Sequence, residues 1–191
     1  MLTGTTELDA VNTLLGSIGE APVNAVVYDG LSDAAVALRV LLRIARKIES
    51  QGPRCCVEED FPLTPDAVTG EISVPSNILN VKGRDPYREI VLRGTKLYDK
   101  TNHTYRFDRT IQCDVTWFLP FNNLPEHVKH LIVIRATHQF QKEVMASNQL
   151  ATFTEEDLRE AQAEFVSREM TNNQITTLTS PGVAPILDRR F

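Results

Sequence analysis

The sequence predicts an α+β protein in which a helical bundle carries an inserted small antiparallel β domain and ends in an irregular C-terminal tail. Apolar residues recur at helical spacing near both ends of the chain, and the segment between them holds short β-rich runs separated by prolines. The last residues are polar and contain two prolines and a glycine, which oppose a helix. We therefore expect a discontinuous bundle over residues 1–56 and 121–172, a β insert over 57–120, and a C-terminal tail over 173–191.

Two helices are expected before the β insert. Thr6 has a side chain suited to capping a helix over residues 6–18, and Gly19 is suited to end that helix. A second helix is expected over residues 33–51, where Gly52 and the proline after it stop the helical pattern.

The β insert is expected to hold five short strands. The runs that predict them are Ile72–Val74, Glu89–Leu92, Lys96–Tyr98, Thr104–Phe107 and Ile111–Leu119. The polar segment Asp99–His103 lies between two of these runs and predicts a hairpin loop.

Two further helices are expected after the insert. The first covers residues 125–146 and begins at Pro125, a residue favoured in the first helical turn. The second covers residues 155–171, because Thr154–Asp157 has the form of a capping box. From Asn172 onward we expect irregular structure.

Composition limits the possible classes of protein. The 191 residues are 42% hydrophobic and 24% charged, which is ordinary for a soluble globular protein, and the net charge of −5 does not favour nucleic-acid binding as the default. Cys55, Cys56 and Cys113 form no CxxC pair, so we expect a reducing compartment and no disulfide framework. The N-terminus does not resemble a signal peptide, and no apolar run has the length of a membrane span.

The motifs of common enzymes and metal sites are weak here. Gly16–Gly19 is one residue short of a GxSxG nucleophile elbow and fits a helix C-terminus better. His127 and His130 lie three residues apart on an expected helix, with His138 further along, but no HExxH pattern is present. We expect these histidines to be helix residues without a metal, and we expect no catalytic residue and no cofactor.

Two charged groups leave alternatives open. The carboxylates of Glu58, Glu59 and Asp60 suit a solvated acidic loop, and a glycosidase that uses a carboxylate pair is the alternative. Arg39, Arg43 and Arg46 form a basic stripe on the second helix, which suits a solvated face. The alternative for the stripe is contact with an acidic partner subunit or with DNA, as in a small nucleic-acid-binding module.

The N-terminal segment Glu7–Val23, ELDAVNTLLGSIGEAPV, resembles the opening of the tail tubular protein A family of podophages. Further matches follow in the same order: Ile48–Gly52 with Val57–Glu59, Leu97–Thr101 with Arg106–Asp108, Leu124–Glu126 with Ile132–Val133 and Gln139–Phe140, and Glu155–Glu169. The resemblance covers about residues 7–170. It departs from the family at Pro53, because the family commonly has a tryptophan just after the glycine that ends the second helix.

The resemblance implies a structural role rather than catalysis. Members of this family form a dodecameric ring, the head-tail connector, between the portal and the tail nozzle. The nozzle protein is of the tail tubular protein B type. Tail fibres attach near the ring. Genomic DNA leaves through the lumen of the ring. The resemblance therefore implies a virion tail protein assembled in the host bacterial cytoplasm. A tail-associated glycosidase acting on host envelope polysaccharide remains the alternative.

The C-terminal tail is a candidate docking segment. Its end contains the apolar and basic residues Ile186, Leu187, Arg189, Arg190 and Phe191, which is unusual for a solvated terminus. We expect this segment to dock on a neighbouring subunit or on the portal, or else to fold back on its own bundle.

Overall fold

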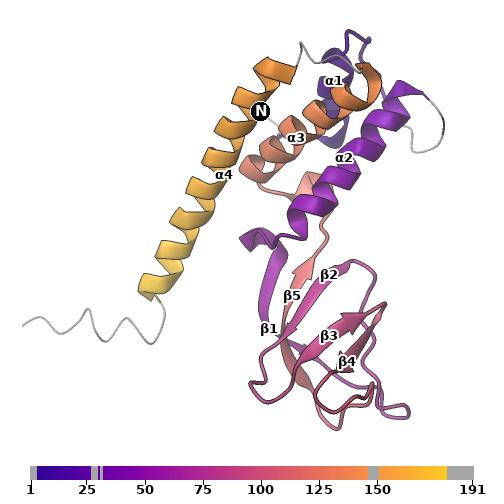
Figure 1. Ribbon diagram of the computed structural model, residues 1–191, viewed down its shortest axis with the longest axis vertical. Coiled ribbons are helices and arrows are strands. Elements are labelled where there is room, and N and C mark those ends of the chain that lie inside the picture. Colours follow the sequence, from indigo (N-terminus) through magenta and orange to yellow (C-terminus); the bar gives the residue numbers. More distant parts are fainter. Residues whose placement is uncertain (1–3, 27–29, 31, 146–150, 180–191) are drawn as a thin grey trace, which may run out of the picture. The chain divides into compact units, whose positions relative to one another are not determined.

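The computed structural model describes residues 4–26, 30, 32–145 and 151–179, with side chains described up to residue 144 and again over 156–171. Within these residues the chain has four α-helices and five β-strands in small antiparallel sheets (Figure 1), which confirms the predicted α+β class. The chain divides into a helical unit, residues 1–44 and 125–191, and a β unit, residues 45–124. Among the described residues, no helix is both long enough and apolar enough to cross a membrane.

The first helix, α1 (Glu7–Gly16), begins at the predicted cap. The Asp9 backbone N–H donates to Thr6 Oγ1 at 3.2 Å, and the Thr6 N–H donates to Asp9 Oδ2 at 3.0 Å. These reciprocal bonds satisfy donors that a helix start leaves open. The chain turns away at Gly19, whose φ of +85° favours glycine.

The second helix, α2 (Asp33–Glu49), also begins as predicted, since the Ala35 N–H lies 3.3 Å from Ser32 Oγ. It ends two residues before the expected boundary at residue 51. The chain leaves it through Gly52 at a φ of +76° and enters the short 3₁₀ helix η1 (Arg54–Cys56).

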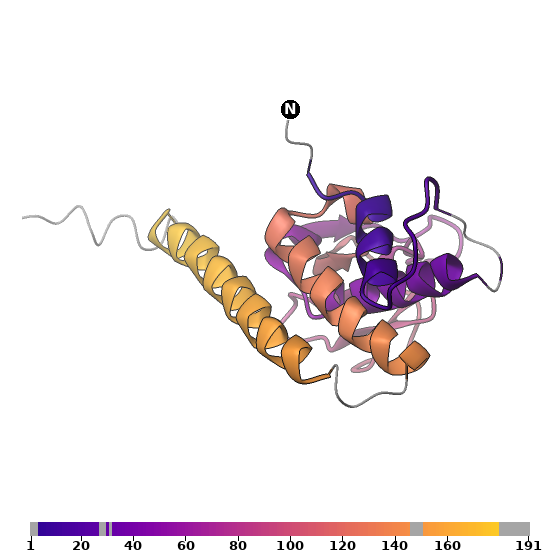
Figure 2. The same cartoon turned by 90° about the horizontal axis from the view of Figure 1, so that it is seen from above.

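Helices α3 (Glu126–Met145) and α4 (Ala151–Thr179) pack along each other in the helical unit (Figure 2). The boundaries of α3 agree with prediction, but those of α4 do not. Thr154–Asp157 lies inside α4, so the predicted capping box there is wrong. The irregular structure expected from Asn172 is wrong as far as Thr179, because helix continues through this polar segment, which contains no proline or glycine.

The larger sheet of the β unit has the strand order β1 (Val57–Leu63), β5 (Ile111–Trp117), β2 (Ile78–Gly83), all antiparallel. A bulge interrupts β1 between Glu58 and Phe61. A second sheet is the hairpin of β3 (Ile90–Arg93) and β4 (Lys96–Asp99). After β5, the 3₁₀ helix η2 (Phe121–Asn123) leads to α3.

The strand prediction was right for three strands and wrong at four segments. Ile72–Val74 and Thr104–Phe107 take part only in isolated bridges, whereas β1 and β2 were not predicted. The loop over residues 99–103 is confirmed, because Asp99 and Thr104 exchange backbone hydrogen bonds of 2.9 and 3.2 Å across it.

The two sheets of the β unit share one core. Its buried apolar residues come from both sheets and from the segments between them: Leu63, Ile72, Val74, Ile78, Val81, Ile90, Leu97, Phe107, Ile111, Cys113 and Val115. The sheets approach closely at Gly83, where an added Cβ would lie 3.0 Å from two carbon atoms of Ile90. A side chain at this position would therefore require the Ile90 side chain to shift by a few tenths of an ångström.

Candidate functional site

The predicted basic stripe on α2 is exposed, and each of its arginines has a different partner. Arg43 forms an ion pair with Glu143 of α3. Arg39 donates to the Gly30 carbonyl at 3.5 Å, and the Arg46 guanidinium lies 5.6 Å from the ring centre of Phe118. These contacts are local, and the stripe as a binding surface for an acidic partner or DNA stays a prediction.

The predicted histidines lie on α3. His127 is part of the α3–α4 packing, with its Nε2 3.3 Å from Glu169 Oε1 and its ring 6.2 Å from that of Phe165. His130 is exposed and His138 is half-buried. Within the part of the chain that the structure describes, no group of three or more His, Cys, Asp or Glu residues is arranged to hold a metal ion.

The acidic run that motivated the glycosidase alternative surrounds one arginine. Arg84, which follows β2, donates to Glu59 Oε2 at 2.7 Å, to Asp60 Oδ2 at 2.8 Å and to Asp114 Oδ1 at 2.5 Å. The hydrogen bonds to Asp114 and Glu59 raise the pKa of Arg84. The bulge in β1 helps to form this cluster, because Asp60 has a φ of 56° and its N–H lies 3.3 Å from Asp114 Oδ1. Arg84 and Asp114 were not predicted as part of this cluster, because they are distant from the acidic run along the chain.

A second arginine of the β unit, Arg88, has three carboxylates nearby. Its guanidinium lies 3.4 Å from Asp108 and 4.0 Å from both Asp85 and Asp99. Asp99 is only 1% exposed. Burial opposes ionisation of Asp99, but hydrogen bonds from Asn102 and Thr101 and the charge of Arg88 outweigh it and lower its pKa.

Glu49, at the end of α2, is a buried carboxyl that the sequence analysis did not single out. Its side chain is fully buried, and Oε2 accepts the Leu119 backbone N–H at 2.7 Å. Oε1 has no hydrogen-bond partner among the described residues. Burial raises the pKa of Glu49 to about 6, although the hydrogen bonds from Leu119 and Cys56 favour the ionised form.

The three cysteines lie in the β unit, and none of them forms a disulfide with another described residue. Cys55 is exposed, with its Sγ 3.6 Å from Sγ of the buried Cys56. Burial raises the pKa of the Cys113 thiol to about 11. A buried thiol of raised pKa is a poor nucleophile, so Cys113 acts as a small apolar core residue.

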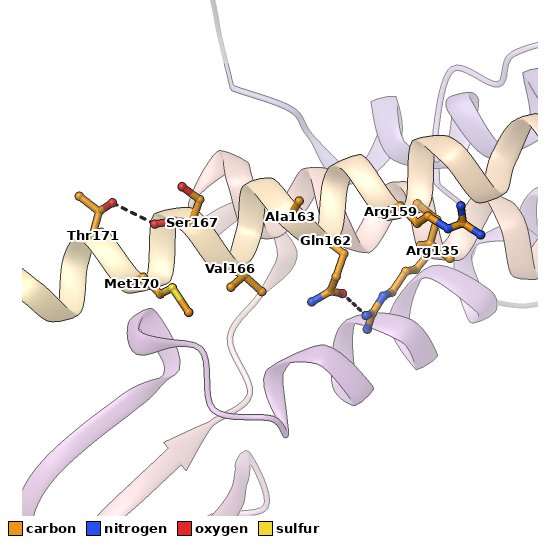
Figure 3. Close-up of a pocket in the computed structure, with 9 residues that line it drawn as sticks. Arg135, Arg159, Gln162, Ala163, Val166, Ser167, Met170 and Thr171 are labelled. Atoms are coloured by element: carbon orange, nitrogen blue, oxygen red, sulfur yellow. Dashed lines mark hydrogen bonds between the residues drawn. The ribbon is translucent and has the colours of Figure 1, made fainter.

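Two grooves flank α4 in the helical unit. One has a volume of about 820 Å³, and Figure 3 shows its lining side chains from α3 and α4. They include Arg135, Arg159, Val166 and Met170, and Arg135 donates to the Gln162 side chain. We call this the basic groove.

The other groove has a volume of about 520 Å³, and we call it the acidic groove. Val133 and Ile134 of α3 supply apolar surface, Glu126 and Glu164 supply carboxylates, and His127 and His130 also line the groove. Hydrogen bonds from Lys129 and Thr5 lower the pKa of Glu126, so its carboxylate stays ionised at neutral pH. Neither groove was predicted from the sequence, because each depends on how α4 packs on α3.

The predicted docking residues Ile186, Leu187, Arg189, Arg190 and Phe191 lie outside the described residues. Docking of this segment therefore stays a prediction. The described part of α4 ends at Thr179.

The helical unit thus carries two grooves beside α4, and in the β unit Arg84 and Arg88 each have three carboxylates nearby. Comparison with known proteins agrees with the resemblance seen in the sequence. A family model described as tail tubular protein matches residues 8–175. The chain is 30% identical over 169 residues to tail tubular protein A of Klebsiella phage KP34, a match that covers 88% of each chain.

The chain therefore belongs to the tail tubular protein family. It is a structural protein of a phage tail, and its place is in the virion. The family match extends across both units and includes most of α4.

Proposed function

We propose that the chain is the repeating subunit of a tail adaptor ring, which joins the portal to the tail nozzle and forms part of the DNA ejection channel. The observation that carries this proposal is the family match over residues 8–175, which leaves few residues of the chain outside the tail tubular pattern. The relative from Klebsiella phage KP34 carries the name tail tubular protein A, and it matches over nearly the same fraction of its own length.

The geometry of the helical unit supports a ring. A closed ring of identical subunits needs two different surfaces on each subunit, one for each neighbour. The basic and acidic grooves flank α4 and carry opposite charge. A net charge of −5 also suits a channel for DNA, because an acidic protein does not hold the phosphate backbone electrostatically.

The partners follow from this role. The subunit contacts its own copies in a dodecameric ring, the portal on one side and a nozzle of the tail tubular protein B type on the other. A tail fibre binds near the ring, and genomic DNA passes through the lumen. Assembly takes place in the cytoplasm of the host bacterium, before the ring becomes part of the virion.

Electron microscopy of the purified protein tests the proposal. The protein is imaged by negative stain alone and after mixing with its purified portal ring, and mass photometry gives the number of subunits bound. We expect an added ring on one face of the portal, and no added ring on the portal of an unrelated phage. A protein that neither forms a ring nor binds its portal would contradict the adaptor role.

The carboxylates that a glycosidase would need have another role in this geometry. Glu59, Asp60 and Asp114 are all hydrogen-bonded to Arg84, so one guanidinium group holds the three carboxylates together instead of leaving two of them to face a substrate. This arrangement favours the structural role over the glycosidase alternative. Release of sugar from host envelope polysaccharide, lost in Glu59→Gln, would reverse that preference.

A further inference from the structure

Helix α4 carries an exposed row of side chains along the basic groove. Arg159, Val166 and Met170 are spaced by seven and four residues, which puts them on one face of the helix. Val166 and Met170 are 37% and 60% exposed. Figure 3 shows both pointing to the same side of α4 as Gln162. We call these three residues, Arg159, Val166 and Met170, the α4 row.

The α4 row combines apolar surface with positive charge. Arg159 forms no ion pair with any other described residue, and neither does Arg135, which binds the amide of Gln162. An exposed valine and methionine beside two arginines fit a partner surface that offers both apolar contact and carboxylates.

The acidic groove on the other side of α4 offers both. Val133, 8% exposed, and the half-buried Ile134 line it. Glu164 lines the same groove, with its side chain 47% exposed and 4.0 Å from Arg168, a separation that leaves the carboxylate accessible. The groove volume of about 520 Å³ is enough for the side chains of a valine and a methionine.

We infer that the α4 row of one copy packs into the acidic groove of a second copy. Val166 and Met170 then contact Val133 and Ile134, while Arg159 pairs with Glu164 of the second copy. The inference rests on the proposed ring and names the surfaces that join its neighbours.

The row and the groove lie on different sides of the same helix. At about 100° per residue, Glu164 is about 140° around α4 from Arg159. One copy can therefore use its row toward one neighbour and its groove toward the other, as head-to-tail assembly needs. A symmetric pairing of two rows would instead bring the arginines of both copies together, which like-charge repulsion opposes.

Charge reversal tests this pairing. Arg159→Glu gives a row and a groove that are both acidic, and Glu164→Arg gives a row and a groove that are both basic. We expect each variant to need about tenfold or more protein for half-maximal assembly, measured by mass photometry alone and on the portal ring. Lys142→Glu is the matched control, because it reverses an exposed charge on α3 outside both surfaces and leaves assembly unchanged.

Mixing the two variants gives the sharper result. In an alternating assembly, the reversed row of Arg159→Glu meets the reversed groove of Glu164→Arg, and the unchanged row meets the unchanged groove. We therefore expect an equimolar mixture to regain assembly, and the double variant Arg159→Glu/Glu164→Arg to regain it alone. Circular dichroism of each variant checks that the helices are intact.

The outcomes separate this inference from the proposed function. If the unmodified protein assembles and both single variants assemble equally well, the row-to-groove pairing is wrong and the ring stands. Single variants that fail but do not rescue each other also overturn the pairing. An unmodified protein that assembles neither alone nor on its portal overturns the ring and the pairing together.

Discussion

Two arginines of the β unit and two arginines of the helical unit differ in whether carboxylates surround them. In the β unit, Arg84 and Arg88 each have three carboxylates around them, so these guanidinium groups have their partners within the unit. In the helical unit, Arg135 and Arg159 line a groove and form no ion pair with a described residue. The difference indicates which surface of each unit is available to a partner.

The two units also differ in how their exposed apolar residues are arranged. In the β unit, Val68 and Tyr87 are 93% and 86% exposed, but they lie in separate turns. In the helical unit, Val166 and Met170 share one face of a long helix beside a groove. Apolar groups that share a face form a continuous contact surface, whereas isolated groups are ordinary on protein surfaces.

The largest expected change in stability comes from Phe140→Ala, which tests whether the two units have separate cores. Phe140→Ala removes a fully buried ring from α3 and should lower the free energy of unfolding by about 3–5 kcal/mol. Circular dichroism at 222 nm follows the helices, and the fluorescence of Trp117 in β5 follows the β unit. We expect the helical transition to move further than the Trp117 transition.

The control for this change is Val144→Ala, at an exposed position of the same helix, which should alter stability by no more than about 0.5 kcal/mol. Equal shifts of both transitions in Phe140→Ala would contradict the separation of the two cores.

A smaller effect is expected from the buried carboxyl of Glu49. Its pKa is about 6 in the folded protein, above the ordinary value of 4.5, so the folded state binds the proton more tightly than the unfolded state. The contribution to stability is therefore complete below pH 4.5 and is lost as the pH rises through about 6. This shift corresponds to about 2 kcal/mol.

Glu49→Gln isolates this effect, because glutamine keeps an oxygen for the Leu119 N–H and does not ionise. Urea unfolding followed by Trp117 fluorescence is compared for the two proteins at pH 4.5, 6 and 7.5. The stability of the glutamine variant relative to the parent should rise with pH. A constant difference across this range would show that Glu49 has no raised pKa.

The smallest effect is expected at Arg84, because two of its three partners, Glu59 and Asp60, are largely exposed and solvent screens exposed ion pairs. Arg84→Met leaves Glu59, Asp60 and Asp114 to repel one another, which should lower the urea midpoint of the Trp117 transition. Salt screens this repulsion, so the loss should shrink between low and high ionic strength. Arg106→Met, which removes an exposed arginine outside the cluster, should show less salt dependence.

The first three helices could be predicted from the sequence because their ends carry local signals. Thr6, Ser32 and Pro125 mark starts, and Gly19 and Gly52 mark ends. Helix α4 begins earlier and ends later than predicted, and its polar second half offered no stop signal other than Pro181, beyond its end.

The two missed strands have sequences that do not resemble strands. β1 contains three acidic residues and a proline, and β2 contains an asparagine and ends in glycine. Both form through pairing with β5, a contact that lies far away along the chain. Ile72–Val74 has a composition suited to a strand but forms only isolated β-bridges. Its apolar side chains are buried in the core.

The environments of Arg84, Glu49 and Arg159 were also hard to predict, because their partners are distant along the chain. Arg84 becomes the centre of a cluster only once β1, β2 and β5 are paired. The environment of Glu49 depends on the backbone at Leu119, and the groove around Arg159 depends on α3. Side-chain partners distant along the chain leave no periodic pattern in the sequence.

The glycine at position 83 lies where the two small sheets approach each other over their shared core. A two-stranded hairpin is marginally stable by itself, and the close approach of Gly83 to Ile90 lets the hairpin share the core of the three-stranded sheet. The amide hydrogens of β3 and β4 should therefore exchange with solvent together with those of β2 and β5, through one common opening event. Separate opening of the hairpin would expose Ile90 and Leu97, which are buried in this shared core.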